Sequence, residues 1–348
     1  GRCRRDGGRA KVFVNGEFVV SHEGGYSAFR ADITEKCTEE FNTIAIWCSN
    51  EKCDAIYPQS ADFTFYGGLY RGAHLICVPE THFELLHYGD LGIHAATEPA
   101  SWDKEDFMLH IRTKICGVEK DNQVIYQIFD EDGKEVASAA RPADSPDTSI
   151  PLYKPHRWDI KNSYQYTLKA LIMRNNECLD EVELKFGVRT FCCDPGRGFL
   201  INGNCVPLRG VSRHQDKLYQ GNALTKEDHI RDAELIEEIG ANTVRLAHYQ
   251  HAQEFYNECD KRGFVVWAEI PFISVMNEDP LAHENCITQL KELIYQNDHH
   301  PSICFWGISN EILIGGISEK LVENHRELNA LAKKIDPYRL TTIAHVTM

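Results

Sequence analysis

The stretch ANTVRLAHYQHAQEFYNECDKRGFVVWAEIPF, residues 241–272, decides the fold of the second half of the chain. It opens with the apolar run TVRLAHY (243–249), continues with a helical segment that ends at Gly263, and closes with the apolar run VVWAEIPF (265–272). Nearly continuous apolar runs are typical of strands buried on both faces, which occur in parallel sheets covered by helices. The stretch therefore predicts a strand, a helix and a strand in one βα unit.

The same order of strand and helix extends in both directions from this stretch. The run PLRGVSRH (207–214) precedes a helical segment for which Thr225 is the expected N-cap. Downstream lie a helix at 281–300, the run ICFWGISNE (303–311), a helix at 318–336 and the apolar run LTTIAHV (340–346). Repeated units of this kind fit either a doubly wound sheet or a (β/α)8 barrel.

Polar residues at the strand ends favour the barrel. In a barrel the C-terminal ends of all strands open onto one face, where such side chains converge into one site. No glycine-rich phosphate loop follows the first strand, which argues against a nucleotide-binding doubly wound sheet. We therefore predict a partial (β/α)8 TIM barrel, strands 1–5, over residues 192–348. The residues expected around its open face are Arg209, His214, Arg245, His248, Glu269, Asn310 and Glu311.

The first half of the chain has the pattern of antiparallel β-sandwiches. VFVNGEFVV (12–20) places an Asn-Gly turn between two β-rich runs, and FNTIAIWC (41–48) and DFTFYGGLYRGAHLICV (62–78) read as further strands. From 92 to 191 strands recur every 8–12 residues, which is typical of an immunoglobulin-like sandwich. We predict a jelly-roll-like, N-terminally incomplete unit at 1–88 and an immunoglobulin-like unit at 89–191, in a multidomain β and α/β protein.

Composition limits the classes of partner. The 37 Lys and Arg residues are outnumbered by 52 Asp and Glu residues, and the net charge of -15 disfavours nucleic acid and anionic lipid surfaces as partners. No run approaches the roughly 20 apolar residues of a membrane helix, so the sequence predicts a cytoplasmic protein. The 13 cysteines are scattered without paired metal spacing, and we expect reduced thiols, no disulfide, no metal and no cofactor.

Glu311 is the centre of the predicted chemistry. A carboxylic acid at a strand end, beside the amide of Asn310 and flanked by Arg and His, suits glycoside hydrolysis, which needs one acid to protonate the leaving oxygen and a second carboxylate. Trp267, Trp306 and Tyr249 are candidate apolar faces for sugar rings. Other interpretations stay open.

Taken alone, Glu311 could cap the helix that follows it, and His214 and His248 could be hydrogen-bonded core groups. Asp298-His299-His300-Pro301 resembles a metal cluster but better fits a loop leading into the fourth strand. Arg245 is harder to explain structurally, because a buried guanidinium needs a carboxylate partner.

Several of these stretches resemble glycoside hydrolase family two, and its β-galactosidase branch in particular. PLRGVSRHQD (207–216), the stretch 241–272 and HHPSICFWGISNE (299–311) resemble the first four strands of the catalytic barrel. YGGLYRG (66–72) and FGVRTF (186–191) resemble the sugar-binding jelly roll and the end of the immunoglobulin-like domain. The resemblance covers essentially the whole chain.

The resemblance implies a role for each matching residue. Glu311 matches the general acid/base, and Asn310 the amide that binds the sugar 2-hydroxyl. His214 and His248 match ligands of sugar hydroxyls, and Arg245 matches the residue that keeps the nucleophile ionised. The other residues expected to bind substrate, at the rim or floor of the pocket, are Arg209, Glu269 and Trp267.

Departures from the family pattern restrict these implications. Arg71-Gly72 stands where many β-galactosidases have Arg-Asp, and Ile273 and Val275 stand where large bacterial galactosidases bind magnesium. The carboxylates after Glu311 all fall in the helix at 318–336, so no nucleophile can stand about 5 Å away. We expect the chain to be cut at both ends and inactive in isolation.

The predicted function of the complete enzyme is retaining hydrolysis of terminal β-D-galactosides, with a small carbohydrate as substrate and a homo-oligomer as a possible assembly. The alternatives are a β-glucuronidase or other family-two glycosidase, and a non-catalytic carbohydrate-binding protein.

Overall fold

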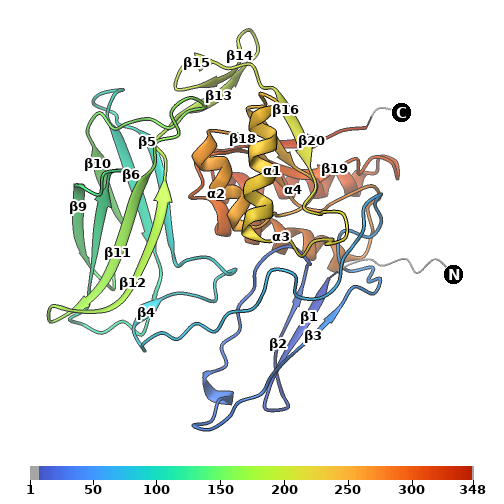
Figure 1. The fold of residues 1–348 in the computed structure, drawn as a ribbon, viewed down its shortest axis with the longest axis horizontal. Coiled ribbons are helices and arrows are strands. Elements are labelled where there is room, and N and C mark those ends of the chain that lie inside the picture. The colour runs from blue at the N-terminus through green and yellow to red at the C-terminus, as the bar shows by residue number, and fades with distance from the viewer. Residues whose placement is uncertain (1–7, 347–348) are drawn as a thin grey trace.

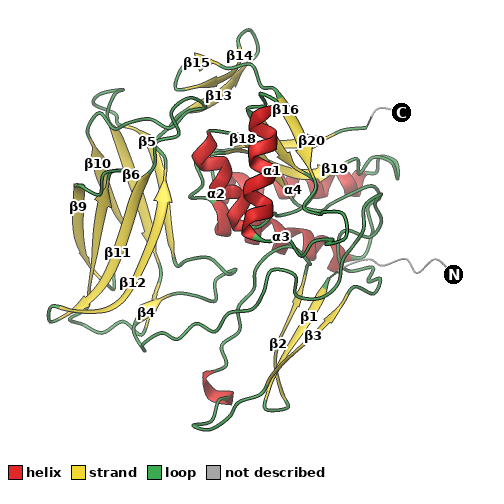
Figure 2. Ribbon diagram, viewed as in Figure 1, coloured by secondary structure: helices red, strands yellow, loops and turns green. Residues whose placement is uncertain are grey.

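The computed structural model describes residues 8–346, and antiparallel strands make up its first half while strands and helices alternate in its second (Figures 1 and 2). Near the N-terminus, β1 (Arg9–Val14), β2 (Glu17–Glu23) and β3 (Ile44–Ser49) form a sheet of order β2-β1-β3, with the short 3-10 helix η1 (Thr34–Lys36) in the loop. Asn15 and Gly16 turn the β1-β2 hairpin with positive φ angles of 52° and 87°, as the Asn-Gly pair predicts.

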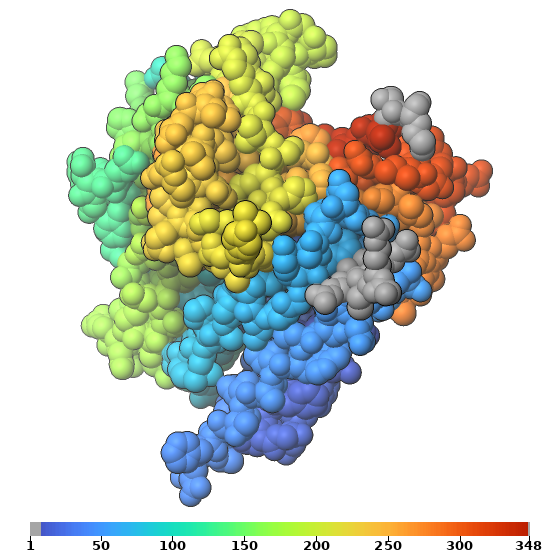
Figure 3. Space-filling model, turned by 45° about the vertical axis from the view of Figure 1, so that its right-hand side comes forward, coloured from blue at the N-terminus to red at the C-terminus, as the bar shows by residue number. Residues whose placement is uncertain are grey.

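The expected strand at 62–78 does not form. No strand lies between β3 and β4 (His82–Phe83), and the segment instead runs along the second half of the chain, where Nη2 of Arg71 donates to the carbonyl of Gln250 at 2.8 Å. Gly68 and Gly72 take positive φ angles within it. Side chains of this segment pack against the barrel, and its backbone has no partner strand within residues 8–346 (Figure 3). The strand prediction is therefore wrong, because strand-like composition forms a strand only where a partner strand exists.

A two-sheet sandwich follows. One sheet has the order β10-β6-β5 and the other β12-β11-β8-β9, and their inward side chains, such as Phe107, Tyr126 and Leu168, form one apolar core. Phe83 belongs to this core, so the second unit begins a few residues before 88. Its further strands are β5 (Ile93–Pro99), β6 (Phe107–Thr113), β7 (Ile115–Cys116), β8 (Gln123–Phe129), β9 (Glu135–Pro142), β10 (Thr148–Leu152), β11 (Tyr166–Arg174) and β12 (Glu177–Phe186).

A small antiparallel sheet, which the sequence did not suggest, joins the sandwich to the α/β half. It consists of β13 (Phe191–Asp194), β14 (Gly198–Ile201) and β15 (Asn204–Cys205). Phe199 and Ile201 pack with Trp158 and with Val265 at the start of the third barrel strand. The sheet therefore covers the N-terminal edge of the barrel strands.

The second half is the partial TIM barrel that the sequence predicts. Its strands are parallel, in the order β16-β17-β18-β19-β20. Val244, Ala268 and Trp306 point to the helices, while residues that alternate with them point to the inner side. Thr225 caps the first helix in a capping box with Asp228, as predicted. The elements are β16 (Gly210–Arg213), α1 (Lys226–Glu238), β17 (Thr243–Leu246), α2 (Gln253–Arg262), β18 (Val265–Glu269), α3 (Pro280–Asn297), β19 (Ile303–Asn310), α4 (Glu319–Ile335) and β20 (Leu340–Ala344).

Helix α3 holds the two halves together through a buried polar face. Nδ2 of Asn285 donates to the carbonyl of Glu23 at 2.9 Å, and Nε2 of Gln296 donates to the carbonyl of Tyr88 at 2.6 Å. These bonds satisfy polar groups that would otherwise be costly to bury. The side chains that form this face are Asn285, Gln289, Glu292 and Gln296.

Two findings concern the helices and the cysteines of residues 8–346. None of these helices is long and apolar enough to cross a bilayer. These cysteines are all free thiols.

Candidate active site

Arg245 forms the centre of the candidate site. It lies on β17, and its guanidinium donates from Nε and Nη2 to the two carboxylate oxygens of Glu269, at 3.2 and 2.8 Å. Nη2 also donates to Oδ1 of Asn310 at 2.6 Å. Glu269 ends β18 with its side chain fully buried, and Asn310 ends β19. One guanidinium thus joins the ends of neighbouring strands, and Glu269 is the carboxylate partner that a buried Arg requires.

His248 contacts both members of the Arg245–Glu269 ion pair. Its Nδ1 is 2.7 Å from Oε1 of Glu269 and 3.0 Å from Nη2 of Arg245. His214, which follows β16, packs edge to face against it with ring centroids 5.1 Å apart. Burial, and then the charge of His248, lower the pKa of His214 below its ordinary value, so this ring is neutral at pH 7. The guanidinium at the centre disfavours a metal cation here.

Glu311 directly follows these residues and is exposed. Its φ is 49°, a conformation that non-glycine residues rarely adopt and that is frequent at functional sites. The conformation is held by its N–H, which donates to the carbonyl of Ala344 at 2.9 Å. The cap of α4 is Ser318, whose Oγ accepts from the N–H of Leu321 at 3.1 Å. Glu311 therefore does not cap the helix.

The three aromatic residues expected to offer faces to sugar rings lie in different places. The ring of Trp267 lies 4.7 Å from the Arg245 guanidinium, on the inner side of β18. Trp306 points to the helices, where its Nε1 donates to Oδ2 of buried Asp336 at 2.9 Å, so the expectation that it offers a face to sugar is wrong. The alternation of side chains along β19 explains this placement. Tyr249 is also buried.

Phe63 was not predicted to belong here. It comes from the N-terminal segment, and its ring centroid lies 5.0 Å from that of His214 and 6.1 Å from that of His248. Tyr26, also N-terminal, stacks on Tyr249 at 4.2 Å. No spacing in the sequence relates these residues to the barrel strands. They give the site an aromatic wall from another unit of the chain.

Arg209 does not join the site. It precedes β16, at the N-terminal end of that strand, where its backbone pairs with Asn242. The strand begins at Gly210, so Arg209 lies at the opposite edge of the sheet from Glu311. This position corrects the expectation that it lies with the other residues around the open face.

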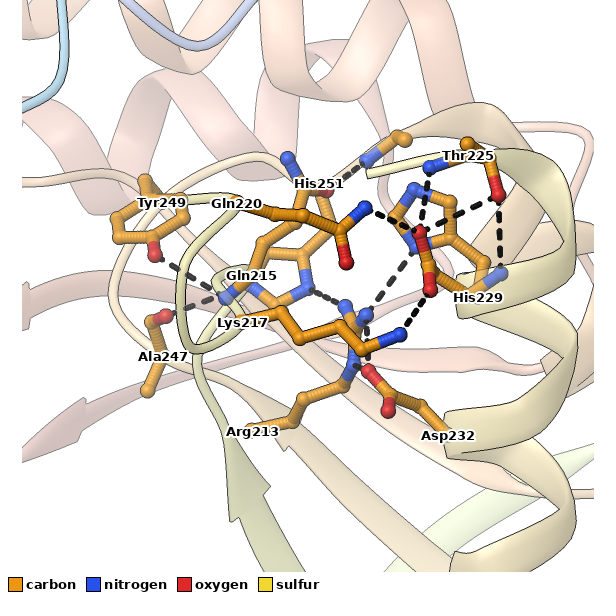
Figure 4. A network of polar contacts seen from close by, with 12 residues as sticks. Arg213, Gln215, Lys217, Gln220, Thr225, His229, Asp232, Ala247, Tyr249 and His251 are labelled. Carbon is orange, nitrogen blue, oxygen red and sulfur yellow. Dashed lines mark hydrogen bonds and ion pairs between the residues drawn. The ribbon is translucent and has the colours of Figure 1, made fainter. Parts of the chain in front are cut away.

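The arginine at the C-terminal end of β16 is Arg213, which points to the helices (Figure 4). Its Nε and Nη2 donate to Oδ2 of Asp232 on α1, at 2.9 and 2.6 Å. Nη1 lies 3.0 Å from Nδ1 of His251, and Nη2 lies 3.1 Å from Nδ1 of His229. Burial, and then the charge of Arg213, lower the pKa of His229 to about 4. The same two causes lower the pKa of His251 well below its ordinary value. Both imidazoles can therefore accept hydrogen bonds from the guanidinium, and the network fixes the loop that carries His214.

Comparisons with known proteins place the chain in a family. The model of the TIM barrel domain of glycosyl hydrolases family 2 matches residues 195–348, and that of glycosyl hydrolases family 2 matches residues 99–189. The chain belongs to glycosyl hydrolase family 2. This confirms the resemblance predicted from the sequence.

Relatives within family 2 carry both activities that the sequence left open. A β-glucuronidase of Bacteroides fragilis is 36% identical over 96% of this chain and 50% of its own length. A β-galactosidase of Thermoanaerobacter pseudethanolicus is 31% identical over 95% of this chain and 44% of its own. The crystal structure of an FMN-binding β-glucuronidase from Facaelibacterium prausnitzii L2-6 is 52% identical and superimposes with a TM-score of 0.96, over 99% of this chain and 53% of that one. The chain spans about half the length of the curated relatives it matches.

Proposed function

We propose that the whole protein hydrolyses terminal β-glycosidic bonds with retention of configuration, and that Glu311 is its general acid/base. The observation that carries this proposal is the end of β19, where the exposed Glu311 follows Asn310, whose amide oxygen is held by Arg245. Membership of glycosyl hydrolase family 2 supports it. Arg209 has no part in this proposal, because it lies at the other edge of the sheet.

We infer different tasks for neighbouring groups. Glu311 is open to solvent, so it can protonate the departing glycosidic oxygen and later take a proton from water. Because Oδ1 of Asn310 is bound to Arg245, its NH2 group is directed to donate to a sugar hydroxyl. His248 contacts Arg245 and packs against His214, and these two imidazoles are the proposed ligands of further hydroxyls.

A second carboxylate about 5 Å from the first is needed for retention. Glu269 does not suit this role, because it is fully buried and both its oxygens accept from Arg245. The proposal therefore assigns the nucleophile to a part of the whole protein outside the described residues. The 348-residue chain alone should then have no measurable glycosidase activity.

For the sugar, we propose β-D-glucuronides in place of the β-D-galactosides first expected. The β-glucuronidases among the relatives support this choice. Gly72 supports it as well, since an acid at this position would repel the carboxylate of glucuronate. β-Galactosides are the second candidate, supported by the β-galactosidases at 28–31% identity.

The test of the sugar is a comparison of kcat/KM for the whole protein on nitrophenyl β-glucuronide and nitrophenyl β-galactoside. We expect the glucuronide to be favoured by a hundredfold or more, because a site built to bind the glucuronate carboxylate leaves polar groups unpaired when galactose binds. A ratio in the opposite direction would replace the glucuronide proposal with the galactoside one. Carbohydrate binding without any hydrolysis would support the non-catalytic alternative.

The test of Glu311 is the substitution Glu311→Gln in the whole protein. Turnover should fall by several orders of magnitude on alkyl glycosides, whose leaving oxygen needs a proton, and much less on activated aryl glycosides. Rates on both kinds of substrate should be measured together, because equal losses would argue against an acid/base role.

A further inference from the structure

Three side chains with nitrogen and oxygen ligand atoms gather where the second unit begins, away from the candidate active site. They are His87, Asp90 and His94, whose candidate ligand atoms all lie within 4.8 Å of one another. Nδ1 of His87 is 2.6 Å from Oδ2 of Asp90, and Nε2 of His94 is 3.1 Å from the same oxygen. One carboxylate oxygen thus faces two imidazole nitrogens.

The carboxylate of Asp90 is fully buried, so its charge needs compensation. Oδ1 accepts from the N–H of Gly92 at 2.8 Å. Arg30, the nearby cation, donates to the backbone carbonyls of Asp90 and Leu85 and not to the carboxylate. Within residues 8–346 no Lys or Arg side chain hydrogen-bonds to this carboxylate, whose bonded side-chain partners are the two imidazoles.

The groups around these three residues are those of a supported metal site. Nδ1 of His94, the nitrogen that faces away from Asp90, is 2.8 Å from Oδ2 of Asp298. A carboxylate on the outer nitrogen of a ligating His fixes its orientation and raises its basicity. The ring of Tyr295 on α3 packs against His87 and His94, with centroids 4.5 and 5.5 Å away.

Access for an ion is provided by His87. Its side chain is 22% exposed, whereas those of Asp90 and His94 are 0% and 7% exposed. Because His87 is partly exposed, a water molecule from the solvent can complete the set as a fourth ligand. Two imidazoles, one carboxylate and a water form a tetrahedral set that suits Zn²⁺.

We propose that Nδ1 of His87, Oδ2 of Asp90 and Nε2 of His94 form a structural zinc site. The cluster lies away from the proposed glycosidase chemistry, because Asp298 follows α3 and precedes β19, at the end of the strands opposite Glu311, and we therefore assign the ion a structural role instead of a part in hydrolysis. The ion fastens residues 87–94 to the C-terminal end of α3, the helix that also binds the N-terminal segment. Further cations close by are Lys291, which donates to the hydroxyl of Tyr88 at 3.1 Å, Lys114, near the Tyr295 ring, and Arg112, which pairs with His94 across β5 and β6.

Protons are the competing occupants of the same atoms. Burial lowers the pKa of His94, but the charges and hydrogen bonds of Asp298 and Asp90 outweigh it and raise this pKa to about 9. A cluster held by protons alone would therefore be stable without an ion. Only a direct measurement of zinc binding separates the two states.

The experiment titrates Zn²⁺ into the chelator-stripped whole protein at pH 8 in competition with a chromophoric chelator. Exposed thiols such as Cys192 and Cys193 are alkylated first, because they bind zinc themselves. We expect one equivalent to bind, His87→Ala to weaken binding at least tenfold, and Asp298→Asn to weaken it ten- to a hundredfold. His110→Ala is the matched control, since His110 also contacts a carboxylate, Glu98, but lies outside the cluster.

Thermal unfolding with and without Zn²⁺ provides a second readout. Zinc should raise the Tm of the wild type and of His110→Ala, and at the same zinc concentration should raise that of His87→Ala clearly less. His87 is partly exposed, so its removal should not prevent folding. The absence of saturable zinc binding, or equal binding by His87→Ala and His110→Ala, would overturn the proposal.

Discussion

The substitution Glu269→Gln tests the centre of the candidate site most directly. It keeps the shape of the side chain but removes a negative charge that is fully buried and bonded to Arg245 and His248. The amide also replaces one acceptor oxygen with an NH2 donor, which must face the guanidinium or the imidazole. The variant thus leaves Arg245 partly buried with a weakened partner.

The structure sets the expected size of the effect. Removing one member of a buried ion pair costs about 3–5 kcal/mol. Arg245 keeps its bond to Oδ1 of Asn310, and its side chain is 20% exposed, so water can replace part of what is lost. We therefore expect a loss of about 3 kcal/mol in the free energy of unfolding, at the lower end of that range. Because Arg245 also positions Asn310, kcat/KM of the whole protein should fall roughly a hundredfold, or about 2.7 kcal/mol.

The assay combines urea unfolding with steady-state kinetics on a nitrophenyl glycoside. Glu258→Gln is the matched control, because Glu258 on α2 is also buried and pairs with Lys261 at 2.8 Å and Arg262 at 3.3 Å, away from the strand ends. It should lower stability while leaving kcat/KM of the folded enzyme unchanged. The reasoning is refuted if Glu269→Gln keeps both wild-type stability and activity, or if Glu258→Gln loses as much activity.

Two further predictions concern packing and pH. A Cβ at position 307 would lie 2.3 Å from Nε1 of Trp267, so Gly307→Ala should lower the free energy of unfolding in urea by about 1–3 kcal/mol. Gly196→Ala should cost little, because a Cβ there would meet only Oδ1 of Asp194 at an ordinary contact distance of 3.5 Å. Equal effects would show that the inner face of the barrel is not tightly packed. The pKa of His229 is about 4 in the folded chain beside Arg213 and near 6.5 when unfolded, so the unfolded state binds more protons between these values and stability falls as pH drops through this window. His229→Gln should reduce the loss of unfolding free energy between pH 7 and pH 4 by on the order of 2 kcal/mol. If the slope of unfolding free energy against pH is the same in the variant and the wild type, the low pKa of His229 is contradicted.

The arrangement of the site in the barrel could be predicted because the C-terminal ends of parallel strands all lie at the same edge of the sheet. Once 243–249 and 265–272 were recognised as neighbouring buried strands, Arg245 and Glu269 had to approach one another at the same edge. Arg209 shows the limit of this inference. The apolar run 207–214 predicts one strand, but only Gly210–Arg213 pair with β17. An error of a few residues in a strand boundary moves a side chain from one edge of the sheet to the other.

The prediction of a strand at 62–78 was wrong for a different reason. Its aromatic and β-branched composition is that of a strand, yet a strand also needs a partner that offers backbone hydrogen bonds, and composition does not reveal whether one exists. Here the side chains find their contacts on the barrel, where Phe63 packs on His214. The contact joins residues 151 positions apart, since 214 minus 63 is 151, and no local pattern encodes it.

Helix α3 explains how that aromatic wall is held in place. Asn285, Gln289, Glu292 and Gln296 follow helical spacing, and a polar stripe of this kind normally indicates a solvated face. In the structure these side chains are buried. Their partners include backbone carbonyls of residues 23, 28, 57 and 88 and the side chains of His22 and Ser27. Such bonds are specific in direction, so they fix the N-terminal segment relative to the barrel more closely than an apolar contact would. Because Phe63 belongs to that segment, the shape of the site depends on polar groups of α3 that never touch it.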